Sequence, residues 1–270
     1  MLLVLALCNV LSLLLPHALA RATPRWQRSM TLNSSDNQDH SFCGIMFDIK
    51  VNDDAPLTMC YITSICVRGS LGPVSVYRTN EFDSSYNGKQ LEPGEWTVVF
   101  SEHCRPSWKK YRELKLDPPV EMKRGETRGF YLHSTELGDQ AIVYDNRRRL
   151  ESSCQDDNIT VQPGMAHLGV IPFSNISQFG WGTWRRGREF VGQINYGVKQ
   201  VLWTKESHHM FPFTFRTGAA SFYVLHALSF SGLPADIVGY VLNMCAWDWF
   251  DYEGMSRSSS KRGSGSCNIS

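Results

Sequence analysis

Side chains suited to binding are concentrated in one short stretch, residues 179–188, which reads FGWGTWRRGR. It holds two tryptophans, three arginines and three glycines. Tryptophan and arginine dominate the binding hot spots of protein interfaces, and a tryptophan face can stack on a sugar ring or a cation. We therefore predict a ligand-binding loop whose contact residues are Trp181, Trp184, Arg185, Arg186 and Arg188.

A structural role is the alternative for this stretch, with both tryptophans capping one end of the domain and the arginines solvated. A second basic cluster, Arg147–Arg149, would form a cationic rim with the loop if both lay at the same end. The whole chain carries a net charge of +1, from 27 basic and 26 acidic residues. Nucleic acid is therefore not an expected partner, because the chain has no general attraction to phosphates.

Catalytic and metal-binding signatures are missing from the sequence, which has no G-x-S-x-G, H-E-x-x-H, P-loop, C-x-x-C or EF-hand pattern. His208 and His209 are adjacent, so on a strand they would point to opposite faces and make a poor joint metal site. His133 and His167 are typical of hydrogen-bonded structural histidines. We expect no catalytic residue, no metal and no cofactor, and keep a jelly-roll hydrolase as a third alternative.

The elements that must position these residues are short strands. Residues 43–49 place alternate apolar side chains on one face, and residues 57–67 are apolar on both faces, as in a central strand. Turn signals such as Asn87-Gly88 recur about every ten residues. The fold class predicted is mainly β, with an antiparallel β-sandwich or jelly roll over residues 42–205.

The pattern becomes helical after Trp203. A helical appendage is predicted over residues 206–253, in which Ile237, Tyr240, Val241, Met244 and Cys245 share one helix face. Residues 21–41 are polar and predict a flexible lead-in to the sandwich. Residues 254–270 are rich in serine and glycine and predict a disordered tail.

The first 20 residues, MLLVLALCNVLSLLLPHALA, resemble a signal peptide cleaved after Ala20, because an apolar run precedes small residues in an A-x-A arrangement. The run is shorter than the roughly 20 residues of a membrane span. A signal peptide usually has a Lys or Arg before its apolar run, whereas this sequence has neither there. We predict a secreted or lumenal protein without a membrane span after cleavage, with a cytoplasmic location as the alternative.

Cysteines and asparagines bear on the same prediction. Cleavage after Ala20 would leave seven of the eight cysteines, so disulfide bonds are predicted with their pairing open and one cysteine left over. Glycosylation is predicted at the four asparagines in N-x-[ST] motifs, which are Asn33, Asn158, Asn175 and Asn268.

Two family resemblances imply different roles. Short motifs that include Gly44–Asp48, Trp96 and Gly129–Tyr131 resemble the PHR-type β-sandwich over residues 42–145, a partner-binding jelly roll of intracellular ubiquitin-ligase and BTB-type proteins. Residues 155–203 depart from that family, which leaves open whether the sandwich ends near residue 145 or near residue 203.

The second resemblance lies in the appendage. Leu233–Val238, followed by Val241-Leu242, is similar to the start of an F-box helix, which docks to a cullin-ligase adaptor. An F-box needs roughly 40 residues in three helices, and only about 20 precede the tail here, so a helix packed on the sandwich is favoured.

These observations favour a non-catalytic secreted or lumenal module that binds a protein or a carbohydrate through its Trp/Arg loop. An intracellular substrate adaptor of a ubiquitin ligase is the second hypothesis, and the jelly-roll hydrolase is the third.

Overall fold

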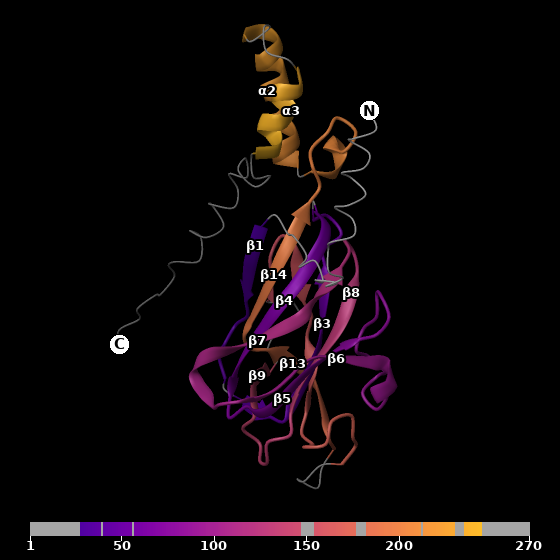
Figure 1. Ribbon diagram of the computed structural model, residues 1–270, viewed down its shortest axis with the longest axis vertical. Coiled ribbons are helices and arrows are strands. Elements are labelled where there is room, and N and C mark those ends of the chain that lie inside the picture. The colour runs from indigo at the N-terminus through magenta and orange to yellow at the C-terminus, as the bar shows by residue number, and fades with distance from the viewer. Residues whose placement is uncertain are drawn as a thin grey trace, which may run out of the picture.

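The protein is described by a computed structural model that covers residues 28–38, 40–55, 57–146, 154–176, 182–211, 213–229 and 235–244. Two antiparallel sheets pack face to face, and a pair of helices extends from one end of them (Figure 1). The predicted β-sandwich with a helical C-terminal appendage is therefore confirmed.

The smaller sheet has four strands in the order β1 (Arg28–Asn33), β14 (Gln193–Gln200), β4 (Leu57–Gly69) and β7 (Ser107–Met122). The larger sheet runs in the order β2 (His40–Phe42), β9 (Ile142–Asn146), β13 (Trp184–Phe190), β12 (Gly164–His167), β3 (Gly44–Val51), β8 (Thr127–Ser134), β5 (Gly72–Thr79) and β6 (Trp96–Cys104). Two short strands, β10 (Cys154–Gln155) and β11 (Ile159–Val161), pair with each other beside β3. Since β6 and β7 end their sheets, both are edge strands.

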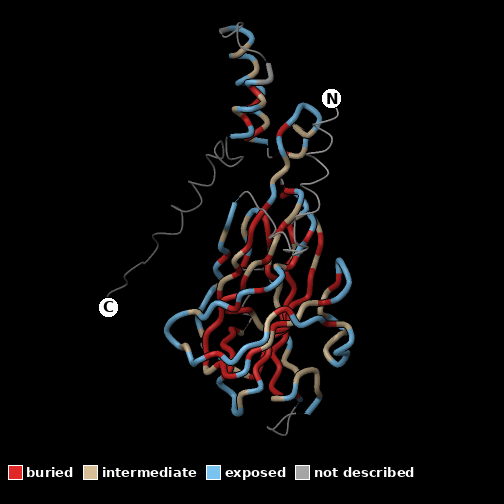
Figure 2. Tube along the Cα trace, viewed as in Figure 1, coloured by how far each residue is buried: buried red, intermediate tan, exposed pale blue. Residues whose placement is uncertain are grey.

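The core lies between the two sheets, where the tube in Figure 2 is coloured as buried. Alternate residues of β3 point inward because a strand has a side-chain period of two, and Ile45, Phe47 and Ile49 are fully buried there. The apolar run 57–67 falls within β4, which lies between β14 and β7 as a central strand.

Part of the predicted flexible lead-in is ordered. Its residues 28–33 form β1, which pairs with β14 and buries Leu32 in the core. The backbone N–H groups of Asn37 and Gln38 donate to the buried Asp145 carboxylate over 2.7 and 2.8 Å. These contacts hold the chain against the sandwich, which the polar composition alone did not predict.

The disulfide prediction is wrong for the cysteines that the structure describes. All five are free and buried: Cys43, Cys60, Cys66, Cys104 and Cys154. They fill the interior as small apolar side chains, and burial raises the pKa of Cys43 to about 11 and that of Cys154 to about 12. Cys245 and Cys267 lie outside the described residues.

The appendage contains α2 (Phe213–Ser229) and α3 (Ala235–Met244), preceded by the 3₁₀ turn η2 (His208–Met210). It has a core of its own, formed by Trp203, Phe211, Phe215, Ala219, Val238 and Leu242. The Asn243 side chain accepts the Trp203 N–H at 2.6 Å and donates to its carbonyl at 3.0 Å. The helices therefore pack on each other and on the connecting segment.

The helix face predicted to pack on the sandwich is instead exposed, because Val238 and Leu242 make the contact with α2. Ile237, Tyr240 and Met244 face solvent. Leu233, which opens the F-box-like motif, lies outside the described residues, as do the signal-peptide and tail segments. Among the helices described, none is long and apolar enough to cross a bilayer.

Candidate functional site

The outer face of the larger sheet carries a second apolar core, here called the outer aromatic cluster. Its buried members are Met46, Trp96 and Tyr131, and Tyr77, Tyr86, Phe173 and Trp184 pack against them. Residues from the segments 80–95 and 168–183, which connect the strands, contribute to this cluster. A face that a sandwich commonly leaves solvated is therefore covered.

Trp184, a predicted ligand contact, belongs to this cluster. Its ring stacks on His167 with centroids 4.0 Å apart and planes 14° apart, and the two residues are paired in register between β13 and β12. Four of the five predicted contact residues therefore lie in strand β13, inside the larger sheet between β9 and β12. Arg185 and Arg188 are half-buried, Arg186 is exposed, and Trp181 lies outside the described residues.

Replacement of Trp184 by alanine should destabilise the fold, because it removes the ring that covers His167. We expect a loss of about 2 kcal/mol in the free energy of unfolding, less than for a fully buried tryptophan. Urea unfolding measures it, with Trp108→Ala as the control, since Trp108 is 41% exposed on β7. Equal, small losses in both variants would show that Trp184 is free of the fold and available to a ligand.

The two buried histidines lie side by side within the cluster, with ring centroids 5.2 Å apart. The Tyr131 hydroxyl donates to Nδ1 of His167 at 2.6 Å, so Nε2 of His167 carries the proton and donates to the Ser174 carbonyl at 3.1 Å. Nε2 of His133 donates to the Gly169 carbonyl at 2.9 Å. Both imidazoles therefore anchor the segment 168–176 to the sheet.

Burial lowers the pKa of His133 to about 4 and, with the neighbouring His133, lowers that of His167 to about 3. Both rings are therefore neutral at pH 7. Among the described residues no three His, Cys, Asp or Glu side chains are grouped as metal ligands. The Asp145 carboxylate accepts the N–H groups of residues 37 and 38. The cluster thus offers no accessible acid–base pair.

A cleft of about 440 Å³ opens where the edge strands β6 and β7 of the two sheets approach each other. Eleven residues from the β5–β6 region, β7 and β8 line it: Arg78, Asn80, Phe82, Thr97, Val98, Val99, Pro118, Pro119, Val120, Glu121 and Arg128. Phe82 is 72% exposed and Val98 is 51% exposed. Apolar walls and two guanidinium groups therefore meet in one accessible cleft, a combination typical of ligand sites.

The two arginines differ in charge balance. Arg128 is buried, its Nε and Nη2 donate to Oε1 of Glu126 at 3.0 and 2.7 Å, and its Nη1 donates to the Thr79 carbonyl. Among the described residues, Arg78 donates only to the carbonyls of residues 79 and 80, both from Nη1. Among the described residues no carboxylate pairs with Arg78. Its charge is therefore not neutralised within the cleft.

Burial and then the Arg128 guanidinium lower the pKa of Arg78. An arginine remains charged after a moderate decrease, because its ordinary pKa is above 12. A carboxylate beside Arg78 would stabilise the charged guanidinium, because it would offset the repulsion between Arg78 and Arg128.

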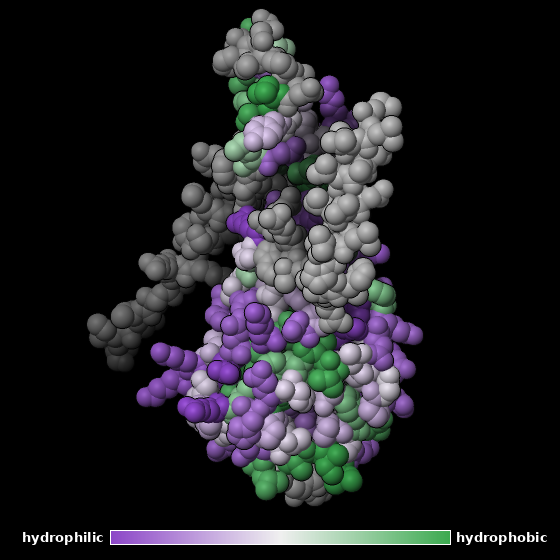
Figure 3. All heavy atoms as spheres, viewed as in Figure 1, coloured by the Kyte–Doolittle hydropathy of each residue, from purple (hydrophilic) through white to green (hydrophobic). Residues whose placement is uncertain are grey.

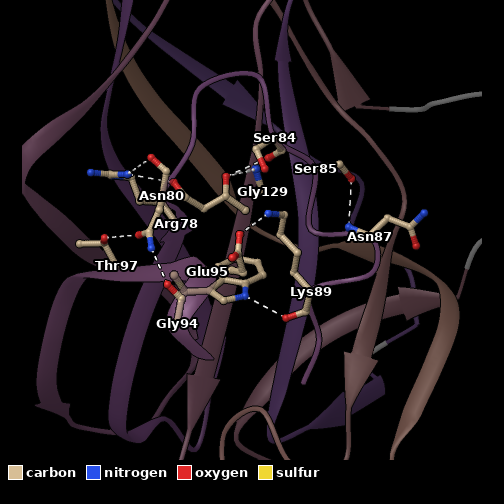
Figure 4. A network of polar contacts seen from close by, with 12 residues as sticks. Arg78, Asn80, Ser84, Ser85, Asn87, Lys89, Gly94, Glu95, Thr97 and Gly129 are labelled. Carbon is tan, nitrogen blue, oxygen red and sulfur yellow. Dashed lines mark hydrogen bonds and ion pairs between the residues drawn. The ribbon is translucent and has the colours of Figure 1, made fainter. Parts of the chain in front are cut away.

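The rim of the cleft is fixed by polar contacts of the segment 80–96 (Figure 4). Asn80 Nδ2 donates to the Gly94 carbonyl at 2.7 Å, and Thr97 donates its hydroxyl proton to Asn80 Oδ1. Lys89 pairs with Glu95 at 2.5 Å, and Trp96 Nε1 donates to the Lys89 carbonyl at 3.0 Å. These contacts within the chain itself hold the rim in place, which favours preorganisation.

The predicted glycosylation positions differ in accessibility. Asn33 and Asn175 are exposed, and Asn268 lies outside the described residues. Asn158 is 3% exposed, and its Nδ2 donates to the Tyr196 hydroxyl at 3.3 Å. The structure therefore contradicts glycosylation of Asn158, because the folded chain leaves no room for a glycan there.

Sequence reasoning missed the cleft, because its lining comes from β5, β6, β7 and β8 and forms no local motif. Phe82 and the Pro118-Pro119 pair are the only local features of the sequence that could have indicated the cleft. In comparisons with known proteins, no protein-family model and no curated protein sequence matches this chain.

Proposed function

We propose that this sandwich is a recognition module that binds an extended acidic segment of a protein in the cleft at Arg78. The observation that carries the proposal is the charge of Arg78, which no described carboxylate neutralises, within an accessible cleft with apolar walls. Arginine binds carboxylates through charge-assisted hydrogen bonds. The Nε and Nη2 atoms of Arg78 donate to no described atom, so they can donate to the two oxygens of one carboxylate.

The remaining surfaces of the cleft suit a polypeptide. Phe82 and Val98 offer apolar contact beside the guanidinium, and the edge strand β6 offers backbone groups that an extended peptide can pair with. A free edge strand is a ready template for another chain. A carbohydrate ligand is the less favoured occupant, because its hydroxyl groups would not neutralise Arg78.

The Trp/Arg site expected from the sequence competes with this proposal. Trp184 is engaged with His167, which leaves Arg186 as the exposed side chain among the described members. We therefore favour the Arg78 cleft and use Arg186 as the comparison. Secretion, signal cleavage and glycosylation of the exposed asparagines remain predictions from the sequence.

Binding of the full chain to fluorescent extended peptides tests the proposal, with Asp/Glu-containing peptides compared with their Asn/Gln counterparts. We expect preference for the acidic set and about tenfold or greater weakening by Arg78→Gln, as for a desolvated charge pair. The matched variant Arg186→Gln should bind like the wild type. Weakening by Arg186→Gln with unchanged binding by Arg78→Gln would place the site on β13, and equal binding of both peptide sets would reject an acidic ligand.

A further inference from the structure

The α2–α3 pair exposes large apolar side chains that nothing in the described part of the chain covers. Eight of them are more than one-third exposed: Phe213, Phe222, Val224, Leu225, Leu228, Ile237, Tyr240 and Met244. Leu228 reaches 79% exposure. Figure 3 shows green, apolar side chains on the visible side of these helices. A soluble monomer rarely keeps so continuous an apolar surface without a partner.

Charged residues are few in the α2–α3 pair. From Thr217 to Ser229 helix α2 has no Asp, Glu, Lys or Arg, and α3 has none after Asp236. Arg216 lies one turn from the start of α2 and Lys205 lies before it, with its Nζ over the Tyr223 ring. These two cationic residues thus come from the end of the appendage nearest the sandwich, whereas Asp236 begins α3 at the opposite end, because α3 returns to place Asn243 beside Trp203.

The width of the apolar surface argues for the kind of partner. At 3.6 residues per turn the exposed apolar side chains of α2 extend over about half of the helix circumference. A helix that packs on one protein surface needs an apolar stripe of about 100°. Lipid contacts a helix from every exposed direction, so the wider surface fits a bilayer better than a single protein face.

Helix α2 is too short to cross a bilayer. Helix α2 has 17 residues, which at 1.5 Å per residue is about 26 Å, and the hydrocarbon core is about 30 Å thick. We propose that the α2–α3 pair inserts into one leaflet of a lipid bilayer and attaches the sandwich to the membrane surface. The attachment is hydrophobic, so a zwitterionic lipid suffices.

Flotation of the full-length protein with phosphatidylcholine vesicles tests this proposal. Wild type should float with the vesicles at both 0.1 and 1 M salt, because screening does not weaken apolar burial. Leu228→Asp should lower the partition coefficient by about tenfold or more, since a buried leucine is lost and a charge is added. Tyr240→Glu, at 66% exposure on α3, should act in the same direction.

The matched control is Leu137→Asp, because Leu137 is 83% exposed on the turn between β8 and β9. It receives the same substitution at an equally exposed site of the sandwich, and it should float like the wild type. All variants keep the same N-terminal apolar run, so a difference between them belongs to the helices.

Three outcomes would overturn the proposal. Equal flotation of the wild type, Leu228→Asp and Tyr240→Glu, or flotation of none of them, would show that the helices do not hold lipid. A vesicle-free wild type that sediments as a dimer and becomes monomeric in Leu228→Asp would identify a second copy as the partner instead. Circular dichroism of each variant confirms that the helices persist.

Discussion

Acidification from pH 7 to pH 5 should lower the free energy of unfolding by about 4 kcal/mol, about 2 kcal/mol for each buried histidine. The pKa of His133 falls from 6.5 to about 4 in the folded protein, and that of His167 falls to about 3. At pH values between these folded pKa values and 6.5, the two histidines are protonated in the unfolded chain and neutral in the folded protein. Stability is therefore complete above about pH 6.5 and is lost as the pH decreases toward 4.

Thermal and urea unfolding between pH 7.5 and 4.5 measure this loss. The single variants His133→Gln and His167→Gln keep a hydrogen-bonding side chain that does not titrate in this range. Each should lose about half of the pH dependence, whatever its stability at pH 7. If both variants followed the wild-type pH profile, other groups would cause the acid sensitivity and the histidines would be protonated in the folded state.

Replacement of Glu126 by glutamine should lower the free energy of unfolding by about 3 kcal/mol, because it leaves Arg128 charged and buried without its partner. Arg128 is 2% exposed, and Glu126 is 7% exposed. The lost carboxylate also accepts the Lys123 N–H at 2.8 Å from its second oxygen. Glutamine has nearly the same size, so the effect belongs to charge and hydrogen bonding.

Asp53→Asn is the control for that substitution, because Asp53 forms an exposed pair with Lys50 at 2.6 Å. Exposed pairs contribute little, so we expect a change within about 0.5 kcal/mol. Denaturant unfolding at neutral pH compares the two variants. A Glu126→Gln protein as stable as Asp53→Asn would mean that water reaches Arg128 and that the wall of the cleft is looser than described.

The sandwich was predictable from the sequence because period-two patterns such as residues 43–49 depend only on local alternation. Strand β13 was not predictable from composition, since the stretch 179–188, which overlaps it, has three glycines and three arginines and resembles a loop. Its neighbours β9 and β12, distant in sequence, supply the ladders that make it a strand. The disulfide prediction failed for a similar reason: cysteines were counted, but their distances in the fold were unknown.

The candidate sites show the same limit. The sequence predicts Trp184 as a ligand contact, but its partner His167 is 17 positions away and belongs to an adjacent strand. In the cleft, the Glu126 carboxylate pairs with Arg128, and no carboxylate among the described residues pairs with Arg78. Which of two arginines is neutralised follows only from the positions of the side chains in the fold.

Hydrogen exchange of the backbone amides, with and without a saturating acidic peptide, tests the binding proposal most directly. The proposed cleft predicts slower exchange in β6 (Trp96–Cys104) and at the end of β5 near Arg78, with β13 (Trp184–Phe190) unchanged. Slower exchange confined to β13, with β6 and β5 unchanged, would contradict the cleft and return the site to the arginines of the Trp/Arg strand.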